Sequence, residues 1–397
     1  MKLQEIAIHE RLAPQKPSAR ETPHVTIEPN TTCNIRCAYC YAIEEAAIKT
    51  LSQVEDEIDL ALTKRNLDAI SLLGGEPTLH PDIVRIVKYV KSKGLVCQVL
   101  TNGVRFVRDG DTDLLDALVA AGVDRFLVHI DHGQKHVHGD IDRARHAMFD
   151  MLDRRRVSYG LSLTLYPGEE ATLPAVMRAY AHHPYFDGVL CTLAFDIDRA
   201  FDEDDHERKR RPSMTKVYRG IREGLGIEPS TYLPSSTDDD EVCWLMYFYY
   251  LDAKTGATFA LSPEFNRAFK RLFRAVKGHD FFAETMNPKW MRASLAATSA
   301  VELALHPTRA RALARLLSGS RSDRRFHYIV VQQGPLFDEA RGRVQICWQC
   351  PDATIRNGKL TPVCIAGRVN PLGGRPVTAP PDVVRTVLSH LGERPEP

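Results

Sequence analysis

Six short runs of apolar and β-branched residues before residue 200 predict strands. They begin at His24 (HVTIEP), Ala69 (AISLLGG), Val96 (VCQVLTNG), Arg125 (RFLVHID), Tyr159 (YGLSLTLY) and Gly188 (GVLCTLAF). Stretches between them have apolar residues at helical spacing, as in DIVRIVKYVKSKG, DLLDALVAAGV and RARHAMFDMLDRRR. This alternation predicts an α/β fold with a parallel sheet. Six strand–helix units are too few for a full eight-stranded barrel, so the sheet is either open and doubly wound or a partial barrel. In both folds, functional side chains gather at the carboxyl ends of the strands.

The alternation ends after Phe195, where DIDRAFDEDDHERKRRPS carries dense charge of both signs and predicts a solvated loop. Beyond it, WLMYFYYLDAKTGATFALS predicts a hairpin that turns at DAKTG. Helical segments follow from Pro263 to about Leu317, then short strands around HYIVVQQ and RVQI, and a last helix in DVVRTVLSHLG. We therefore divide the chain into an N-terminal extension (1–22), a core (23–200), a linker, hairpin and basic helical region (201–330), and a smaller α+β cysteine-rich domain (331–397).

Composition favours a soluble globular protein, with 44% hydrophobic and 26% charged residues. The net charge of +1 argues against a nucleic-acid partner. The N-terminal stretch MKLQEIAIHERLAPQK lacks the apolar core of a signal peptide, and CWLMYFYYL is too short to cross a membrane, so we expect a cytoplasmic protein. There, nine cysteines indicate metal ligands rather than disulfides, although Cys97 and Cys191 lie in predicted strands and are expected to act as small hydrophobic residues.

Three cysteines, Cys33, Cys37 and Cys40, follow the first predicted strand in CNIRCAYC. A closed structural zinc site needs four ligands, whereas iron–sulfur clusters take one thiolate per iron. Three cysteines on a four-iron cluster would leave one iron open to a substrate or cofactor. The spacing alone also allows a zinc site that a distant His or Cys completes.

The cysteine loop, the aromatic Tyr39 before its third cysteine and the segment GGEPTL after the second strand resemble the radical S-adenosylmethionine (radical SAM) enzymes over residues 24–200. The resemblance implies a partial (β/α)6 barrel and a 4Fe-4S cluster whose open iron chelates the amino and carboxylate groups of S-adenosylmethionine. It further implies reductive cleavage to a deoxyadenosyl radical, which abstracts hydrogen from an unactivated carbon. An electron donor of the flavodoxin or ferredoxin type is implied in the same way.

The resemblance also assigns residues to the S-adenosylmethionine site. Tyr39 matches the aromatic residue near the adenine, and Asn102 and Asp131 match polar positions near the ribose or the methionine carboxylate. Asn102 could instead serve only to set a turn with Gly103. The glycine-rich segment that holds the amino group through its backbone corresponds to Gly74, Gly75, Glu76 and Pro77.

A second cysteine group, Cys347, Cys350 and Cys364, lies in CWQCPDATIRNGKLTPVC. Radical SAM enzymes with an appended C-terminal domain often carry further iron–sulfur clusters there, and this group resembles such a site. It departs from the SPASM pattern, which has more cysteines at tighter spacing. Cys243 is a candidate fourth ligand. Structural zinc and buried apolar thiols are the alternatives.

Substrate recognition offers fewer signals. After the fourth strand the segment HIDHGQKHVHGD supplies candidate proton-transfer or binding groups, and Asp196 ends the sixth strand. The imidazoles are His129, His132, His136 and His138. Solvated loop histidines are the alternative.

Positive charge is concentrated in residues 267–325, which contain 13 Lys and Arg against 4 Asp and Glu. Within them NRAFKRLFRAVKG has the pattern of a basic amphipathic helix, which suits an anionic membrane surface or simply the protein's own core. With the aromatic tract WLMYFYY, this pattern favours a hydrophobic or lipid-like small molecule and peripheral membrane contact. A peptide substrate is the alternative. From another class, a non-catalytic, zinc-stabilised binding or regulatory protein also fits the cysteines.

Overall fold

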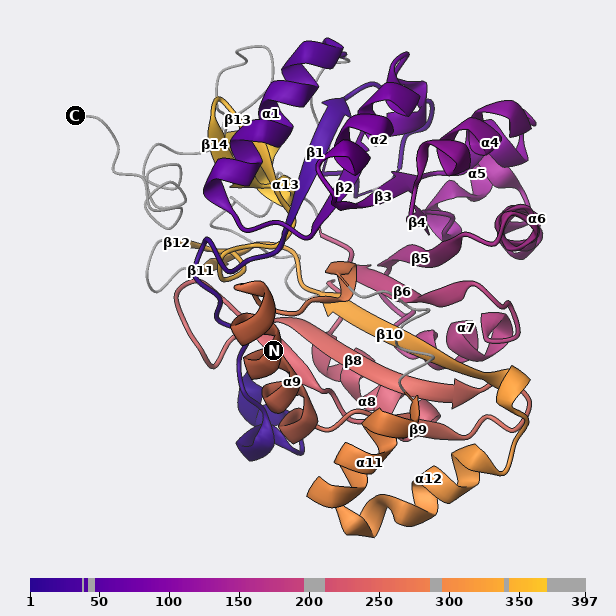
Figure 1. Cartoon of the computed structure of the whole chain (residues 1–397), viewed down its shortest axis with the longest axis vertical. Helices are drawn as coiled ribbons and strands as arrows, with labels where there is room; N and C mark the ends of the chain where they lie inside the picture. Colours follow the sequence, from indigo (N-terminus) through magenta and orange to yellow (C-terminus); the bar gives the residue numbers. More distant parts are fainter. Residues whose placement is uncertain (38, 42–46, 196–210, 286–294, 339–342, 370–397) are drawn as a thin grey trace.

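A curved ten-stranded sheet forms the centre of the computed structural model, which describes residues 1–37, 39–41, 47–195, 211–285, 295–338 and 343–369 (Figure 1). Its first six strands are parallel and are neighbours in the order of the sequence. They are β1 (His24–Asn30), β2 (Ala69–Gly74), β3 (Val96–Thr101), β4 (Arg125–Val128), β5 (Ser158–Leu165) and β6 (Phe186–Leu193). This order has none of the reversal of a doubly wound sheet, so the α/β partial barrel is confirmed.

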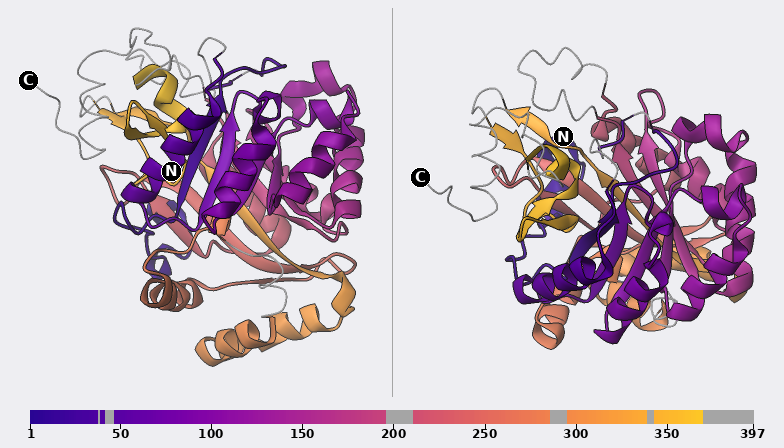
Figure 2. Two further views of the ribbon diagram at one scale, coloured as in Figure 1. Left: turned by 45° about the horizontal axis from the view of Figure 1, so that its top comes forward. Right: turned by 90° about the horizontal axis from the view of Figure 1, so that it is seen from above.

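Helices cover the outer side of these strands (Figure 2). They are α1 (Leu51–Lys64), α2 (Ile83–Ser92), α4 (Thr112–Ala121), α6 (Ile141–Arg155) and α7 (Leu173–Tyr180), with the short α3 (Val104–Val107) and α5 (Lys135–His138) near the strand ends. α2 buries Ile83, Ile86, Val87 and Val90, the spacing of one helix face. Helix α1 begins at a capping box of Thr50 and Gln53.

The sheet continues beyond the boundary expected at residue 200. β10 (Arg324–Gln332) lies parallel to β6, β8 (Val242–Asp252) lies antiparallel to β10, and β7 (Thr231–Pro234) and β9 (Thr258–Ala260) pair with β8. The predicted hairpin is confirmed as β8 and β9. Every residue of β8 is buried, so the aromatic tract forms part of the core rather than an exposed lipid-binding surface.

The helices of the region predicted to be helical cover β8 and β9. The basic helices are α9 (Pro263–Lys277) and α12 (Ala310–Leu317), α11 (Leu295–Leu305) packs on α9, and α8 (Met214–Leu225) lies behind the sheet in Figure 1. In α9, Phe269 and Phe273 lie 4.9 and 5.3 Å from the ring of Phe281, whereas Leu272 and Val276 are 58% and 73% exposed. Among the described residues, no helix is both long and apolar enough to span a membrane.

The segment after β10 returns to the first strand, beside which Figure 1 shows its yellow elements. It contains the hairpins β11 (Leu336–Asp338) with β12 (Arg343–Gln345) and β13 (Ala353–Arg356) with β14 (Lys359–Pro362), then α13 (Val363–Val369). The buried Arg65 donates to the carbonyl oxygens of His24 and Cys350 at 2.6 and 3.0 Å. The buried pair of Arg356 and Glu28, at 2.7 Å, adds a second attachment. The predicted last helix lies outside the described residues.

Gly188 allows β6 and β10 to approach, because a Cβ atom there would lie 2.0 Å from the carbonyl oxygen of Tyr328 and its φ is 153°. We expect Gly188→Ala to lower the free energy of unfolding by roughly 3 kcal/mol or more, through overpacking and backbone strain. Chemical unfolding followed by circular dichroism measures this. Gly168→Ala is the control, since its φ is 96° but no atom lies within 4 Å, and it should cost only about 1–2 kcal/mol. Equal losses in the two variants would contradict the prediction.

Candidate active site

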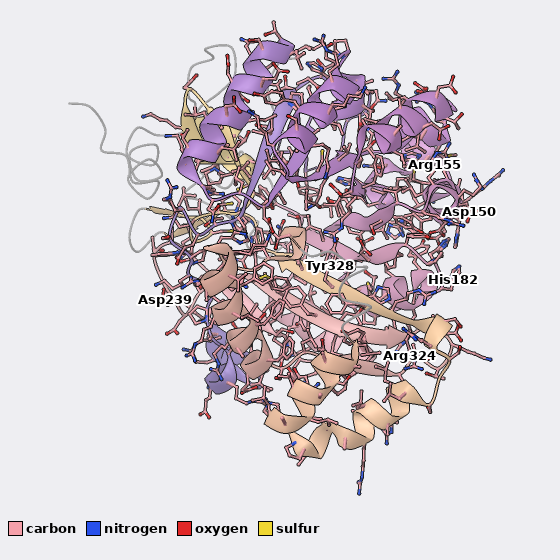
Figure 3. The ribbon with its side chains drawn as sticks, viewed as in Figure 1. Asp150, Arg155, His182, Asp239, Arg324 and Tyr328 are labelled. Atoms are coloured by element: carbon pink, nitrogen blue, oxygen red, sulfur yellow. The ribbon has the colours of Figure 1, made fainter. Side chains whose placement is uncertain are left out.

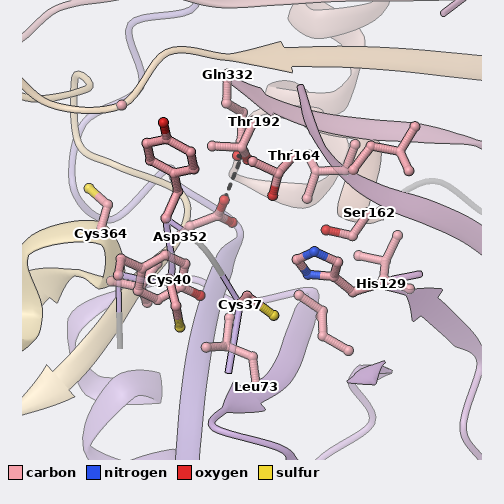
Figure 4. A pocket seen from close by; sticks show the side chains of 18 of the residues that line it. Cys37, Cys40, Leu73, His129, Ser162, Thr164, Thr192, Gln332, Asp352 and Cys364 are labelled. Atoms are coloured by element: carbon pink, nitrogen blue, oxygen red, sulfur yellow. Dashed lines mark hydrogen bonds between the residues drawn. The ribbon is translucent and has the colours of Figure 1, made fainter. Parts of the chain in front are cut away.

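A cavity of about 570 Å³ opens at the carboxyl ends of the strands, with apolar and polar walls. Both cysteine groups predicted from the sequence line it: Cys33, Cys37 and Cys40 from the first, and Cys347, Cys350 and Cys364 from the second. In Figure 4, Cys40 and Cys364 lie on one side of the cavity and His129 and Ser162 on the other. The fold thus brings together two cysteine groups that lie more than 300 residues apart.

The first cysteine loop is held by amide side chains from neighbouring strands. Asn102 places its Nδ2 atom 3.8 Å from the Sγ atom of Cys33, and Gln134 places its Nε2 atom 3.6 Å from that of Cys37. Burial raises the pKa of Cys33 above its usual value and that of Cys37 to about 12. The free thiols are therefore protonated at neutral pH, and metal binding would have to release these protons.

Gly74 and Gly75 lie directly beneath this loop. A Cβ atom on Gly74 would meet the carbonyl oxygen of Asn30 at 2.1 Å, and one on Gly75 would meet that of Thr32 at 2.1 Å. The N–H of Gly75 donates to Asn30 at 2.9 Å, and the N–H of Glu76 donates to Thr32 at 2.8 Å. Only glycine permits so close an approach, so local packing of the backbone is enough to require glycine at both positions of GGEP.

The carboxylate of Glu76 is buried and accepts hydrogen bonds within the protein. Its donors are the N–H and hydroxyl of Thr78, the hydroxyl of Thr101 and the N–H of Asn102, at 2.6 to 3.1 Å. Burial raises its pKa, although these bonds oppose the shift. Pro77 is buried and begins the short 3₁₀ turn Pro77–Leu79. Glu76 therefore joins the ends of β2 and β3.

Asn102 sets the turn considered from the sequence and also bonds to the cysteine loop, while its role at S-adenosylmethionine stays a prediction. Its Oδ1 atom accepts the N–H of Val104 at 3.0 Å, which sets the turn, while its Nδ2 atom donates to Asn34 of the cysteine loop at 2.8 Å. Tyr39 lines the cavity with its ring 5.7 Å from that of Tyr166. Both predicted residues therefore lie at the cavity, and Tyr166 is a further aromatic residue to which the sequence pattern assigned no role.

Asp131 lies at the end of β4, and its carboxylate is occupied by protein donors. It accepts the N–H groups of Gly133 and Thr164 at 2.9 and 3.1 Å and pairs with Nε2 of His129 at 2.9 Å. Burial favours the neutral acid, but the bonds to His129 and the backbone outweigh it and lower the pKa of Asp131. His129 itself lines the cavity, so Asp131 orients a cavity residue.

The other candidate histidines bond elsewhere or face solvent. His132 pairs with Glu169 at 2.5 Å, His138 bonds to the carbonyl of Asn102 at 3.0 Å, and His136 is exposed. Asp196 lies outside the described residues. Of the four imidazoles, all of which the structure describes, His129 is therefore the one that lines the cavity.

A polar wall crosses from β6 to the C-terminal segment. The hydroxyl of Thr192 donates to Gln332 at 3.1 Å, and Gln332 donates to Asp352 at 2.8 Å. Burial raises the pKa of Asp352 to about 6. Sequence reasoning missed both residues, because a polar side chain at the end of HYIVVQQ becomes a signal only once that strand is known to join the main sheet.

The second cysteine group gains Cys243 from β8. A hydrogen bond with Cys243 is the largest cause that raises the pKa of Cys347 well above its usual value. A hydrogen bond with Cys347 is likewise the largest cause of the raised pKa of Cys350. Burial is the largest cause of the raised pKa of Cys364, and the negative charge of Cys350 raises it further. The candidate fourth ligand therefore contacts the C-terminal group, while Cys97 and Cys191 are fully buried in the core.

The model of the radical SAM superfamily matches residues 27–154. The GTP 3′,8-cyclase of Chlorobaculum tepidum is 39% identical over 118 residues, which are 28% of this chain and 34% of that protein. The S-adenosylmethionine-dependent nucleotide dehydratase of Selenomonas ruminantium is 40% identical over 72 residues, 18% of this chain and 26% of that protein. The chain thus spans about a third or less of these relatives. The structure of Streptococcus suis SuiB bound to S-adenosylmethionine has 14% identity and a TM-score of 0.37, over 44% of this chain and 42% of that chain.

We expect Asp131→Asn to lower the free energy of unfolding by about 1–3 kcal/mol at pH 7, because it weakens three partly buried hydrogen bonds. The folded-state pKa of Asp131 is lowered, so this stability is present above the unfolded pKa of about 3.9 and is lost as the pH falls through the folded value. In chemical unfolding, the gap between wild type and variant should therefore shrink below about pH 4. Asp113→Asn, exposed on α4, is the control. A gap that does not change with pH would contradict the prediction.

Proposed function

We propose that this chain, whose residues 27–154 match the radical SAM superfamily, is an enzyme that cleaves S-adenosylmethionine reductively and abstracts hydrogen from an unactivated carbon. One observation carries the proposal. Cys33, Cys37 and Cys40 open onto the same cavity as the two glycines of GGEP, at the carboxyl ends of parallel strands.

The residues present fit a 4Fe-4S cluster, because three thiols line one cavity and the glycine-rich segment beside them exposes its backbone to it. When bound, the cluster and S-adenosylmethionine would supply the electron and the deoxyadenosyl radical, which are the chemistry of the cofactors rather than of the protein. The protein would position them. Gly74 and Gly75 would present backbone groups to the methionine amino group, Tyr39 would lie against the adenine, and Asn102 would orient the ligand and the cysteine loop together.

The cavity lining bears on the substrate. Arg36 is the one lysine or arginine among the described lining residues. A triphosphate usually meets several cations, so this lining gives little support to a substrate such as the GTP named for the Chlorobaculum tepidum relative. The polar wall of Thr192, Gln332 and Asp352, together with Ser162, instead offers hydrogen-bonding groups without positive charge.

A lipid-like substrate draws less support from the aromatic tract than its sequence indicated, because β8 is buried. Of its residues, all of which the structure describes, Trp244 lines the cavity. The polar wall is compatible with the alternative peptide substrate. Peripheral membrane contact and an electron donor of the flavodoxin or ferredoxin type stay predictions.

Anaerobically reconstituted protein given a reductant and S-adenosylmethionine should release deoxyadenosine, and Cys37→Ala should reduce that release to background and lower the iron content. Cys97→Ala, whose thiol is buried in β3, is the matched control and should keep both. Liquid chromatography and iron analysis measure the two quantities. Equal release from wild type and Cys37→Ala would refute the proposal. A protein that binds only zinc and releases nothing would support the non-catalytic alternative.

We further propose that Cys243, Cys347, Cys350 and Cys364 hold a second metal centre, an iron–sulfur cluster or zinc. The contact of Cys243 with Cys347, and of Cys347 with Cys350, supports this assignment. Four thiolates complete the ligand set of either centre. Such a centre would join β8 to the segment that Arg65 attaches to β1.

Cys350→Ser should remove the metal of this second centre while leaving the first in place. For a second 4Fe-4S cluster, we expect about half of the bound iron to be lost; for zinc, all of the zinc. Metal analysis and the electron paramagnetic resonance signal of the remaining cluster distinguish the two cases. Cys191→Ser, in β6, is the control. Unchanged iron and zinc in Cys350→Ser would overturn the assignment.

A further inference from the structure

We propose that His146, His182 and His183 form a binding site for a divalent transition metal such as Zn²⁺ on the outer surface of the barrel. One nitrogen of each ring lies within 4.8 Å of the others. His146 belongs to α6, and the other two follow α7 (Leu173–Tyr180). Figure 3 shows Asp150 and His182 at the edge of the molecule. None of the three histidines lines the active-site cavity, so the proposal is independent of the proposed function.

A carboxylate orients the His183 ring for metal binding. Its Nδ1 atom lies 2.7 Å from Asp153, which also accepts the hydroxyl of Tyr159 at 2.9 Å. A carboxylate on one ring nitrogen fixes the tautomer and leaves a lone pair on the other, the arrangement usual behind a metal-bound histidine. His183 is 4% exposed and packs on Phe149, so its ring cannot turn away freely.

The nitrogen separations suit a metal. Nε2 of His183 lies 3.3 Å from Nδ1 of His146. Zinc–nitrogen bonds of about 2.0–2.1 Å at tetrahedral angles put two ligand nitrogens about 3.3–3.4 Å apart. The His182 ring lies 4.3 Å from the His183 ring, and one of its nitrogens lies within 4.8 Å of the ligand nitrogens of His146 and His183.

Aromatic packing alone does not account for the group. It explains the buried ring of His183 against Phe149, and a hydrogen bond to His183 orients His146, but neither accounts for the exposed His182, which places a nitrogen within 4.8 Å of both. Three neutral nitrogens with an adjacent carboxylate leave one tetrahedral position to water, which makes an open, exchangeable site. A bound ion would link α6 to the loop between α7 and β6.

The test uses untagged protein whose cysteine centres have been loaded, with Co²⁺ as a spectroscopic probe and Zn²⁺ in calorimetry. Wild type should bind one additional ion, with visible Co²⁺ bands that disappear in His182→Gln and His146→Gln, and each variant should bind Zn²⁺ at least about tenfold more weakly. Both histidines are exposed, so these variants should keep the melting temperature of the metal-free protein.

His136→Gln, an exposed histidine on α5, is the matched control and should bind as wild type does. The difference spectrum between wild type and His182→Gln should lack thiolate-to-cobalt charge-transfer bands, because its ligands are nitrogens. Unchanged Zn²⁺ affinity in both variants, or a difference spectrum dominated by thiolate bands, would overturn the proposal.

Discussion

Two carbonyl oxygens, those of Asn30 and Thr32, occupy the space in which a side chain on residue 74 or 75 would begin, and the geometry of the cavity depends on that close approach. The approach holds the chain leaving β1 against the chain leaving β2. Hydrogen bonds from the N–H groups of Gly75 and Glu76 make the crossing rigid. The cysteine loop starts one residue later, so its position follows from backbone contacts rather than from the cysteines themselves.

The C-terminal segment connects the two halves of the sheet's carboxyl end. On one side Arg65 donates to the carbonyls of His24 and Cys350; on the other, the N–H of Trp348 donates to the carbonyl of Pro234, the last residue of β7. Burial lowers the pKa of Arg65 to about 10, which leaves the guanidinium charged at neutral pH. A buried charge is tolerated when its donors are satisfied, and here carbonyl oxygens accept from Nη1 and Nη2 of Arg65, while Nε has no hydrogen-bond partner among the described residues. Removing these partners would leave an uncompensated charge inside the protein.

Much of the first half could be predicted from the sequence, because apolar runs separated by helical patterns leave few alternatives to a parallel sheet. The cysteine loop and GGEP could be placed at strand ends for the same reason. The position of β10 between β6 and β8 could not, since pairing between distant segments depends on tertiary packing rather than on local periodicity. The roles of Gln332 and Asp352 could not be predicted for the same reason, because they depend on the position of β10. Asn102 shows a different limit, because the sequence indicated its turn but not the bond of the same amide to Asn34 in the cysteine loop.

The strand order has a consequence for synthesis of the chain. β10 pairs with β6 but is separated from it by more than a hundred residues, within which β7, β8 and β9 are made first. As the nascent chain leaves the ribosome, the edge of β6 therefore has no partner until residue 332 has emerged. An unpaired apolar edge is a site of intermolecular association, so expression at low temperature or with chaperones should favour the folded protein.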